Sequence, residues 1–474
     1  MSKDDQWMGT DDENVTAGGM EPPYSENILR LLNPLRRLIR QKQLIDKLHA
    51  KLDTKIQSLR QECLPLLMED GIRRIPNEIL VNIFRIGHRS TRNYSFLISV
   101  THVCRRFRSL ALQESSLWTG IKVTPRYNTD KILAFIDRSR QQDLDVTFTI
   151  GGYGLHAERA DFPDAFQASS LRWTSFHTDS GSFQYIPVDL PLSRVRKLYF
   201  VNESSEYVNN IPWMLPGLQG FVGLNAIPKF CCTTPLLTEC MLAFSKRFIQ
   251  ASEFMNCLAQ LLSIENLQLV FQNTTPLDHN SMAAAPLTLM PAVQTLHVTM
   301  EVEDDVRLVK ALLSRLVMAN MSRLIIGCQD VKDAVTVLKP LYSRYPRVFG
   351  TPRIIGLNIS SAKDVDITAI ILEPLHCVCH LSIIIPHAKV ITTLASYSGG
   401  NEDLREKIGS LQILRFVQCH QLLEQQVETL ADNLLDNGSG RGIQLLEIFS
   451  CRSISEGFLK DMSRKLGDKI SWRT

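Results

Sequence analysis

The chain has 474 residues, of which 44% are hydrophobic and 21% charged, and its formal net charge is +3. Length alone suggests about three domains, and the charge balance indicates neither nucleic acid nor a membrane as the partner of the whole chain. The N-terminal MSKDDQWMGTDDEN lacks a basic region followed by an apolar run, and no run of roughly 18 apolar residues occurs. We therefore expect no secretory leader and no membrane span. The eleven cysteines are scattered, which favours reduced thiols and a cytoplasmic or nuclear location.

The first segment of the chain is polar and is followed by an amphipathic one. Residues 1–26 are rich in Asp, Glu and Gly, and we expect a disordered acidic tail. Residues 27–66 then predict one long helix, with Asn33-Pro34 as a plausible start and Pro65 as a stop. The seam of a heptad repeat consists of its a and d positions. In one register every d position here is apolar, and every a position is apolar except two. The seam consists of Ile28, Leu31, Leu35, Leu38, Lys42, Ile45, His49, Leu52, Ile56, Leu59, Cys63 and Leu66.

Two roles for this coiled-coil-like helix stay open at this point. It either packs on its own protein or mediates self-association through residues 28–66, and the polar a positions Lys42 and His49 weaken the second reading. The helix is also basic, as a phosphate-binding helix would be. No aromatic residues interleave with the charges for base stacking, so a solvated face is the better interpretation and nucleic acid is an unlikely partner.

Residues 72–121 predict a small helical module. IRRIPNEILVNIFRIG begins with Pro76 at a first turn, and Glu78 favours the positive end of the helix dipole. A polar loop is expected from Gly87 to about Ser95. The segment ISVTHVCRRFRSLALQ follows, with Val100, Val103, Cys104 and Phe107 at the i, i+3, i+4 and i+7 spacing of one helical stripe. A unit of this size buries its apolar surface incompletely, so we expect a protein partner or a neighbouring domain to cover the rest.

The module resembles an F-box. The F-box pattern runs Leu-Pro-x-Glu-x-Leu-x-x-Ile-Phe, then Val-x-x-Val-Cys-Arg-x-Trp-Arg-x-Leu-Ala, then Leu-Trp. This chain has the first part from Ile75 to Phe84, the second from Val100 to Ala111, and Leu117-Trp118 at the end. It departs from the pattern at Ile75, at Phe107 and in a long basic spacer. The long helix before the module also resembles a layout common among fungal F-box proteins.

The resemblance implies a docking function. In that family the module binds a Skp-type adaptor, which connects it to a cullin-RING scaffold. Carried over to this sequence, the adaptor face or the core beneath it would consist of Ile75, Pro76, Ile79, Leu80, Ile83, Phe84, Val103, Cys104 and Phe107. The sequence does not show which of these residues lie on the adaptor face and which lie in the core beneath it.

A local pattern, apolar-x-x-apolar-x-apolar, recurs over residues 122–474. Copies begin at Val195, Ile264, Val293, Met321, Ile354, Val378, Leu411 and Ile443, and weaker copies begin at Leu171, Leu218 and Leu237. One strand and one helix per copy are typical of leucine-rich repeats. The expected fold is therefore α + α/β: a long helix, an all-helical F-box and a leucine-rich-repeat solenoid with a parallel concave sheet.

The fifth position of each copy is expected to point out of the concave sheet. These residues are Tyr199, Gln268, His297, Ile325, Asn358, Ser382, Arg415 and Glu447. Tyr199, Gln268, His297, Asn358, Arg415 and Glu447 are the candidates for binding a protein substrate, although a merely solvated sheet face is an equally good interpretation of each residue.

No motif in the sequence indicates catalysis or a cofactor. Gly438 to Gly442 lies between a helix and a strand, whereas phosphate-binding loops run from strand to helix. In His376-Cys377-Val378-Cys379-His380, cysteines and histidines would point to opposite faces of a strand and could not share one metal ion. We therefore expect no enzyme, no cofactor and no metal. The expected function is a substrate-recruiting adaptor of a Skp-cullin-F-box ubiquitin ligase. The alternative is a non-degradative scaffold assembled through the coiled coil and the repeats.

Overall fold

The computed structural model describes residues 26–91, 94–124, 128–149, 164–202, 208–230, 234–246, 248–276, 286–344, 352–361, 363–371, 378–393, 408, 410–435 and 442–473. The chain divides into two compact units, residues 1–87 and residues 88–474. The predicted tail at 1–26 lies almost wholly outside the described residues, as do the glycine-rich segment up to residue 441 and residues 376–377 of the His/Cys segment.

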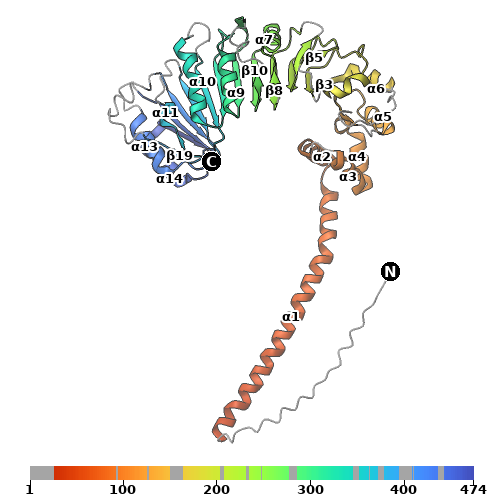
Figure 1. Ribbon diagram of the computed structural model, residues 1–474. Coiled ribbons are helices and arrows are strands. Elements are labelled where there is room, and N and C mark those ends of the chain that lie inside the picture. Colours follow the sequence, from red (N-terminus) through yellow and green to blue (C-terminus); the bar gives the residue numbers. More distant parts are fainter. Residues whose placement is uncertain are drawn as a thin grey trace. The chain divides into compact units, whose positions relative to one another are not determined.

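One long helix makes up most of the described part of the first unit. Helix α1 spans Glu26–Arg74 (Figure 1), whereas the sequence predicted a helix over 27–66. Pro34 and Pro65 lie inside it, so neither acts as the start or the stop that we expected. A proline in a helix interior costs about 3 kcal/mol. The Leu, Lys, Arg and Gln residues on both sides favour the helix strongly enough to continue it past each proline.

Helix α2, Asn77–Thr91, follows a break at Ile75-Pro76 and extends across the boundary between the units. The Leu80 amide donates to the Pro76 carbonyl oxygen at 3.2 Å, which closes the first turn. Because α2 continues to Thr91 and the next helix begins at Tyr94, the polar loop predicted from Gly87 to Ser95 was wrong.

The second unit consists of helices and a large parallel sheet. Its α-helices are α3 Tyr94–Val103, α4 Arg105–Gln113, α5 Thr129–Arg138, α6 Asp164–Ser169, α7 Ala251–Gln260, α9 Glu303–Leu313, α10 Val331–Arg344, α11 Thr368–Ile371, α13 Glu424–Leu434 and α14 Glu456–Leu466. Short 3-10 helices are η1 Ser115–Trp118, η2 Ser170–Arg172, η3 Ser180–Tyr185 and η5 Gly467–Lys469.

The main sheet has 14 strands in the described residues, and each strand pairs in parallel with the next one along the chain (Figure 1). In order they are β1 Gly120–Val123, β2 Leu144–Phe148, β3 Trp173–Asp179, β4 Lys197–Val201, β6 Gly220–Leu224, β8 Glu239–Ser245, β10 Asn266–Gln272, β13 Thr295–Met300, β15 Arg323–Cys328, β16 Ile354–Ile359, β18 His380–Ile384, β20 Ile413–Val417, β21 Leu445–Phe449 and β22 Ile470–Arg473. The predicted parallel sheet is confirmed.

Short parallel ladders accompany the main sheet. They pair β5 Val208–Ile211 with β7 Ile227–Phe230, β9 Phe248–Ile249 with β11 Thr275–Pro276, β12 Thr288–Leu289 with β14 Leu316–Val317, and β17 Val365–Asp366 with β19 Val390–Ile391. Each ladder joins equivalent points of successive strand-and-connection units, so the connections stack in the same order as the main strands.

The same backbone turn recurs where main strands end. Five residues with a positive φ of 51° to 55° directly follow main strands β6, β8, β10, β20 and β21. They are Asn225, Lys246, Asn273, Gln418 and Ser450. Residues other than glycine seldom adopt this conformation. Its repetition at one position shows that successive units share a turn as well as a strand.

The register of the sheet tests the predicted repeats. Leu198, Phe221, Cys240, Leu267, Leu296 and Leu324 are neighbours in successive strands, as are Leu381, Leu414 and Leu446, and all are buried. The pattern positions four and six therefore do form the core in these copies.

Two predicted copies are out of register by two residues. Leu324 pairs with Ile355 and Ile326 with Leu357, so the copy that was started at Ile354 begins at the buried Pro352. Similarly, Phe176 pairs with Leu198, so the copy that was started at Leu171, which is 54% exposed, begins at the fully buried Trp173. In both places an additional apolar residue beside the true core position caused the error.

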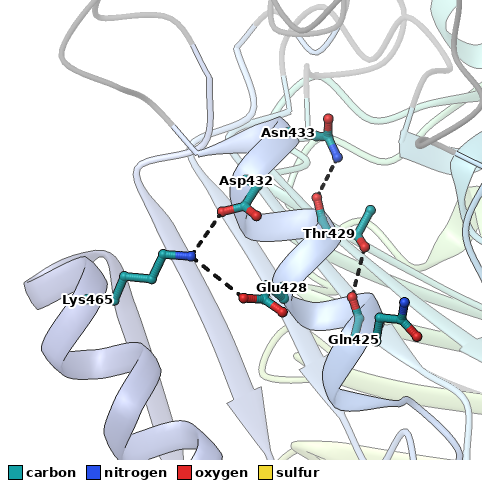
Figure 2. A network of polar contacts seen from close by, with 6 residues as sticks. All are labelled: Gln425, Glu428, Thr429, Asp432, Asn433 and Lys465. Atoms are coloured by element: carbon teal, nitrogen blue, oxygen red, sulfur yellow. Dashed lines mark hydrogen bonds and ion pairs between the residues drawn. The ribbon is translucent and has the colours of Figure 1, made fainter.

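Polar contacts align the outer helices of neighbouring units. Lys465 of α14 lies 3.7 Å from Glu428 and 3.6 Å from Asp432 of α13, while Thr429 and Asn433 bond within α13 (Figure 2). About half of each charged side chain is exposed, and such pairs contribute roughly 0–1 kcal/mol. Apolar burial, rather than these ion pairs, holds neighbouring strand-and-connection units of the sheet together.

Candidate protein-binding surfaces

Helix α2 has one buried and one exposed apolar row. Leu80 and Phe84 are each 3% exposed, whereas Ile79, Ile83 and Ile86 are 49%, 48% and 69% exposed. The three isoleucines follow the i, i+4, i+7 spacing of one helical face. We call them the α2 isoleucine row. A row of this kind on a helix surface is typical of a face that binds another protein.

The second part of the module forms two helices instead of the one helical stripe that we predicted. Cys104 is extended, with φ −158°, and its sulfur caps α4 by accepting from the Phe107 amide at 3.5 Å. The spacing of Val100, Val103, Cys104 and Phe107 suits a continuous helix, so the break at Cys104 was not readable from the sequence. Its consequence is that Val100 is buried while Val103 is 62% exposed.

The end of the module is held by buried side chains. Leu117 and Trp118 are buried, and the Trp118 indole Nε1 donates to the Ala111 carbonyl oxygen at 2.8 Å. The Trp118 ring also packs edge-on against Phe135 of α5, and the Arg138 guanidinium lies 4.5 Å from its centre. The Leu-Trp pair of the F-box pattern is thus a structural anchor in this chain.

The predicted adaptor-binding residues therefore divide into three classes by burial. Leu80 and Phe84 belong to the core, Ile75 and Phe107 are half-buried, and the others are exposed: Pro76, Ile79, Ile83, Val103 and Cys104. The sequence also missed Ile86 and the exposed Ile98, although Ile86 could have been found from its spacing with Ile79 and Ile83.

A hollow of about 390 Å³ lies among α3, α4 and α5. Its apolar lining includes Ile98, Leu112, Trp118 and Phe135, and its basic lining consists of His102, Arg108, Lys131 and Arg138. Sequence reasoning did not identify this hollow, because α5 lies beyond the F-box pattern.

On the outward face of the main sheet, all but one of the predicted fifth-position residues lie in one row across the strands. Tyr199, Gln268 and His297 occupy this row, as do Ile325, Ser382, Arg415 and Glu447. Asn358 does not. The neighbour of Ile325 in β16 is Gly356, so Asn358 lies two residues further along the strand on the same face. The sequence missed His177, Val222 and Met241, of which the last two are the fifth positions of the copies starting at Leu218 and Leu237.

This face is hollowed between β4 and β15. The hollow has a volume of about 340 Å³, and Tyr199, Gln268 and His297 line it together with Val222, Met241 and Ile325. Lys197 and Glu239 also line it, so the surface offers one charge of each sign beside an apolar floor. A hollow with an apolar floor and a few polar groups is typical of a binding site.

Burial lowers the pKa of three histidines on this face. The His177 ring stacks on Tyr199 with 3.9 Å between ring centres, and burial lowers the pKa of His177, although Asp145 at 3.7 Å opposes the shift. Burial also lowers the pKa of His297, and the Arg323 charge adds to the effect. His380 has a pKa lowered by burial and by Arg415.

Arg415 and Glu447 bind each other. The Arg415 Nε donates to the Glu447 Oε2 at 2.6 Å, and the two side chains are 34% and 11% exposed. The Arg415 guanidinium also lies 5.2 Å from the Phe449 ring centre. These two predicted substrate-binding residues therefore pair with each other across β20 and β21.

The described residues contain no group of three or more His, Cys, Asp or Glu side chains placed to hold a metal ion. None of the described helices is both long and apolar enough to cross a membrane.

Residues 72–123 match the family model described as F-box-like. The match covers the α2 isoleucine row, α3, α4, η1 and β1. No curated protein matches the chain in sequence. An F-box-like domain implies binding to a Skp-type adaptor and an adaptor role in a Skp-cullin-F-box ubiquitin ligase.

Proposed function

We propose that this chain is the substrate-recruiting subunit of a Skp-cullin-F-box ubiquitin ligase. Residues 72–123 dock on the Skp-type adaptor, and the outward face of the sheet binds a protein substrate. The observation that carries this proposal is the α2 isoleucine row, which is an exposed apolar face inside the F-box-like segment.

The α2 isoleucine row explains how docking would be stabilised. Burying a whole isoleucine side chain contributes about 1.5–3 kcal/mol. Since Ile79 and Ile83 are about half exposed, a partner that covers them gains about 1 to 1.5 kcal/mol from each. Val103 of α3, which is 62% exposed, is another uncovered apolar side chain of the F-box-like segment.

The sheet unit supports the substrate-binding half of the proposal. We interpret its strand-and-connection units as leucine-rich repeats, because the main strands follow chain order and share a register, and five of them end in the same turn. The hollow between β4 and β15 then lies on the face that such repeats leave free of helices. Tyr199, Met241 and His297 are the residues there that we expect to contact substrate.

The chain's own contribution to the reaction is proximity. We propose that it has no catalytic residues and that it holds a substrate lysine near a ubiquitin carried elsewhere in the ligase. We place it in the cytoplasm or the nucleus, where ligases of this class meet their substrates. Its described cysteines, all free thiols, agree with a reducing compartment.

A double substitution tests adaptor docking. Ile79→Ala with Ile83→Ala is expected to weaken binding to a purified Skp-type adaptor by roughly 30- to 150-fold, since about 2–3 kcal/mol is lost. The thermal midpoint should hardly change, because both side chains are exposed. The matched control is Leu236→Ala with Leu262→Ala, which removes side chains that are 53% and 57% exposed in the sheet unit.

The outcomes separate docking from folding. The control should bind the adaptor like wild type, whereas Leu80→Ala should lower the thermal midpoint because Leu80 is buried. If the Ile79/Ile83 variant bound as tightly as wild type, α2 would not be the docking face.

The scaffold alternative is tested in cells. If the chain recruits substrates for degradation, deleting it raises the abundance of proteins that bind the sheet face. A non-degradative scaffold would leave their abundance unchanged.

A further inference from the structure

Helix α1 exposes an apolar seam, interrupted at Lys42 and His49, with no covering element among the described residues. From residue 30 to residue 64 none of its side chains is buried. Leu31 is 76% exposed, Leu38 62%, Ile45 57% and Leu52 57%. In proteins, most helical stability comes from packing of an amphipathic face rather than from intrinsic helix propensity. This seam therefore needs a partner helix.

We propose that α1 pairs with α1 of a second copy of this chain as an antiparallel coiled coil. The heptad register sets the alignment, because the seam from Leu31 to Cys63 overlaps itself completely in only one antiparallel register. In that register Leu31 lies level with Cys63 of the second copy, and Leu35 lies level with Leu59 of the second copy. The sequence alone left self-association open and assigned no direction.

The charged seam position Lys42 favours the antiparallel direction. In the aligned register Lys42 lies level with Leu52 of the second copy, and the next residue there is Asp53. His49 lies level with Ile45 of the second copy, and the next residue there is Asp46. On the heptad wheel these aspartates occupy e positions, which flank the a positions. An antiparallel pair brings the e positions of both helices to the same side.

Opposite charges therefore meet in the antiparallel coil. Lys42 of each copy faces Asp53 of the other, which gives two ion pairs, while the two Asp46 carboxylates lie near each other at the centre. A parallel coil would instead place Lys42 against Lys42, and its flanking positions would bring Lys55 of each copy near Arg60 of the other. Like charges in contact destabilise the parallel pairing.

The first test is the mass of the full-length chain in solution. Light scattering should give twice the monomer mass of 53.7 kDa. Ile45→Glu with Leu52→Glu should give the monomer, because charges then occupy the seam. Thr54→Glu with Gln61→Glu adds the same charge at exposed positions away from the seam and should remain dimeric. A monomeric wild type would overturn the proposal.

The second test is the direction, read from the native thiol of Cys63, which is exposed. Disulfide formation requires Cα atoms within about 4.4–6.8 Å. On mild oxidation, Leu31→Cys should form a covalent dimer, since the thiol introduced at position 31 then lies level with Cys63 of the second copy. The dimer should disappear when Cys63→Ser is added.

A parallel coil gives the opposite pattern. Wild type would then form a covalent dimer that Cys63→Ser abolishes, and Leu31→Cys with Cys63→Ser would still crosslink. That result would overturn the antiparallel proposal. Both tests are independent of adaptor binding, which the Ile79/Ile83 variant measures.

Discussion

Asp305 connects two neighbouring strand-and-connection units of the sheet. Its replacement should therefore lower the free energy of unfolding substantially. It is the third residue of α9 and is completely buried. Its Oδ2 accepts from the amides of Asn273, Glu301 and Val302 at 3.0, 3.1 and 3.1 Å, and its Oδ1 accepts from the Thr274 amide at 2.7 Å. One carboxylate thus satisfies four amides, two after β10 and two after β13.

Asp305→Ala leaves these four amides without their acceptor. A buried donor that loses its partner costs about 1–3 kcal/mol. Because water can enter the space left by the carboxylate, we expect a total loss of roughly 4–5 kcal/mol in the free energy of unfolding. Asp305→Asn keeps one oxygen and should lose about half as much.

Urea denaturation followed by circular dichroism measures this loss, and amide exchange at Asn273 and Thr274 locates it. Glu303→Ala is the matched control. It removes a carboxylate from the same helical turn, but the Glu303 side chain is 78% exposed and bonds only Arg307 in the described contacts. The control should cost less than about 0.5 kcal/mol. An equal loss in both variants would refute the role of the buried hydrogen bonds.

Further predictions concern the outward face of the sheet. Burial lowers the pKa of His177, His297 and His380 below 6.5, so the unfolded chain binds more protons and stability falls as pH drops through about 6.5. The thermal midpoint should be lower at about pH 5.5 than at about pH 7.5, and the difference should shrink in His297→Gln; an unchanged difference would show that His297 is not involved. Arg415→Ala should destabilise the fold more than Glu447→Ala, by about 3 against 1–2 kcal/mol, because it leaves the more buried charge of Glu447 unpaired. Denaturation of the two variants decides this, and the reverse order would contradict the argument.

Much of the fold could be predicted from apolar spacing. The heptad positions of α1 indicated a helix, and the repeated pattern indicated a parallel sheet with Leu198, Leu267 and Leu296 in its core. Both depend on periodicity, which one sequence shows directly. The errors arose where periodicity is ambiguous. Ile354 and Ile355 are both apolar, so the pattern fitted two registers, and only the pairing of Ile355 with Leu324 decides between them.

The binding surfaces were less predictable, because they depend on which apolar residues are left uncovered. Ile79 and Leu80 are adjacent and equally apolar, yet one is half exposed and the other buried. Similarly, Arg415 and Glu447 were predicted as separate contacts, and their mutual hydrogen bond depends on the pairing of β20 with β21. Such contacts follow from the packing of segments far apart in the chain, which local spacing does not encode.

Direct binding between the full-length chain and a purified Skp-type adaptor is the most direct test of the central claim. Biolayer interferometry with the chain immobilised should give saturable one-to-one binding, which Ile79→Ala with Ile83→Ala weakens and Leu236→Ala with Leu262→Ala does not. Absence of binding by a folded wild-type chain would contradict the account.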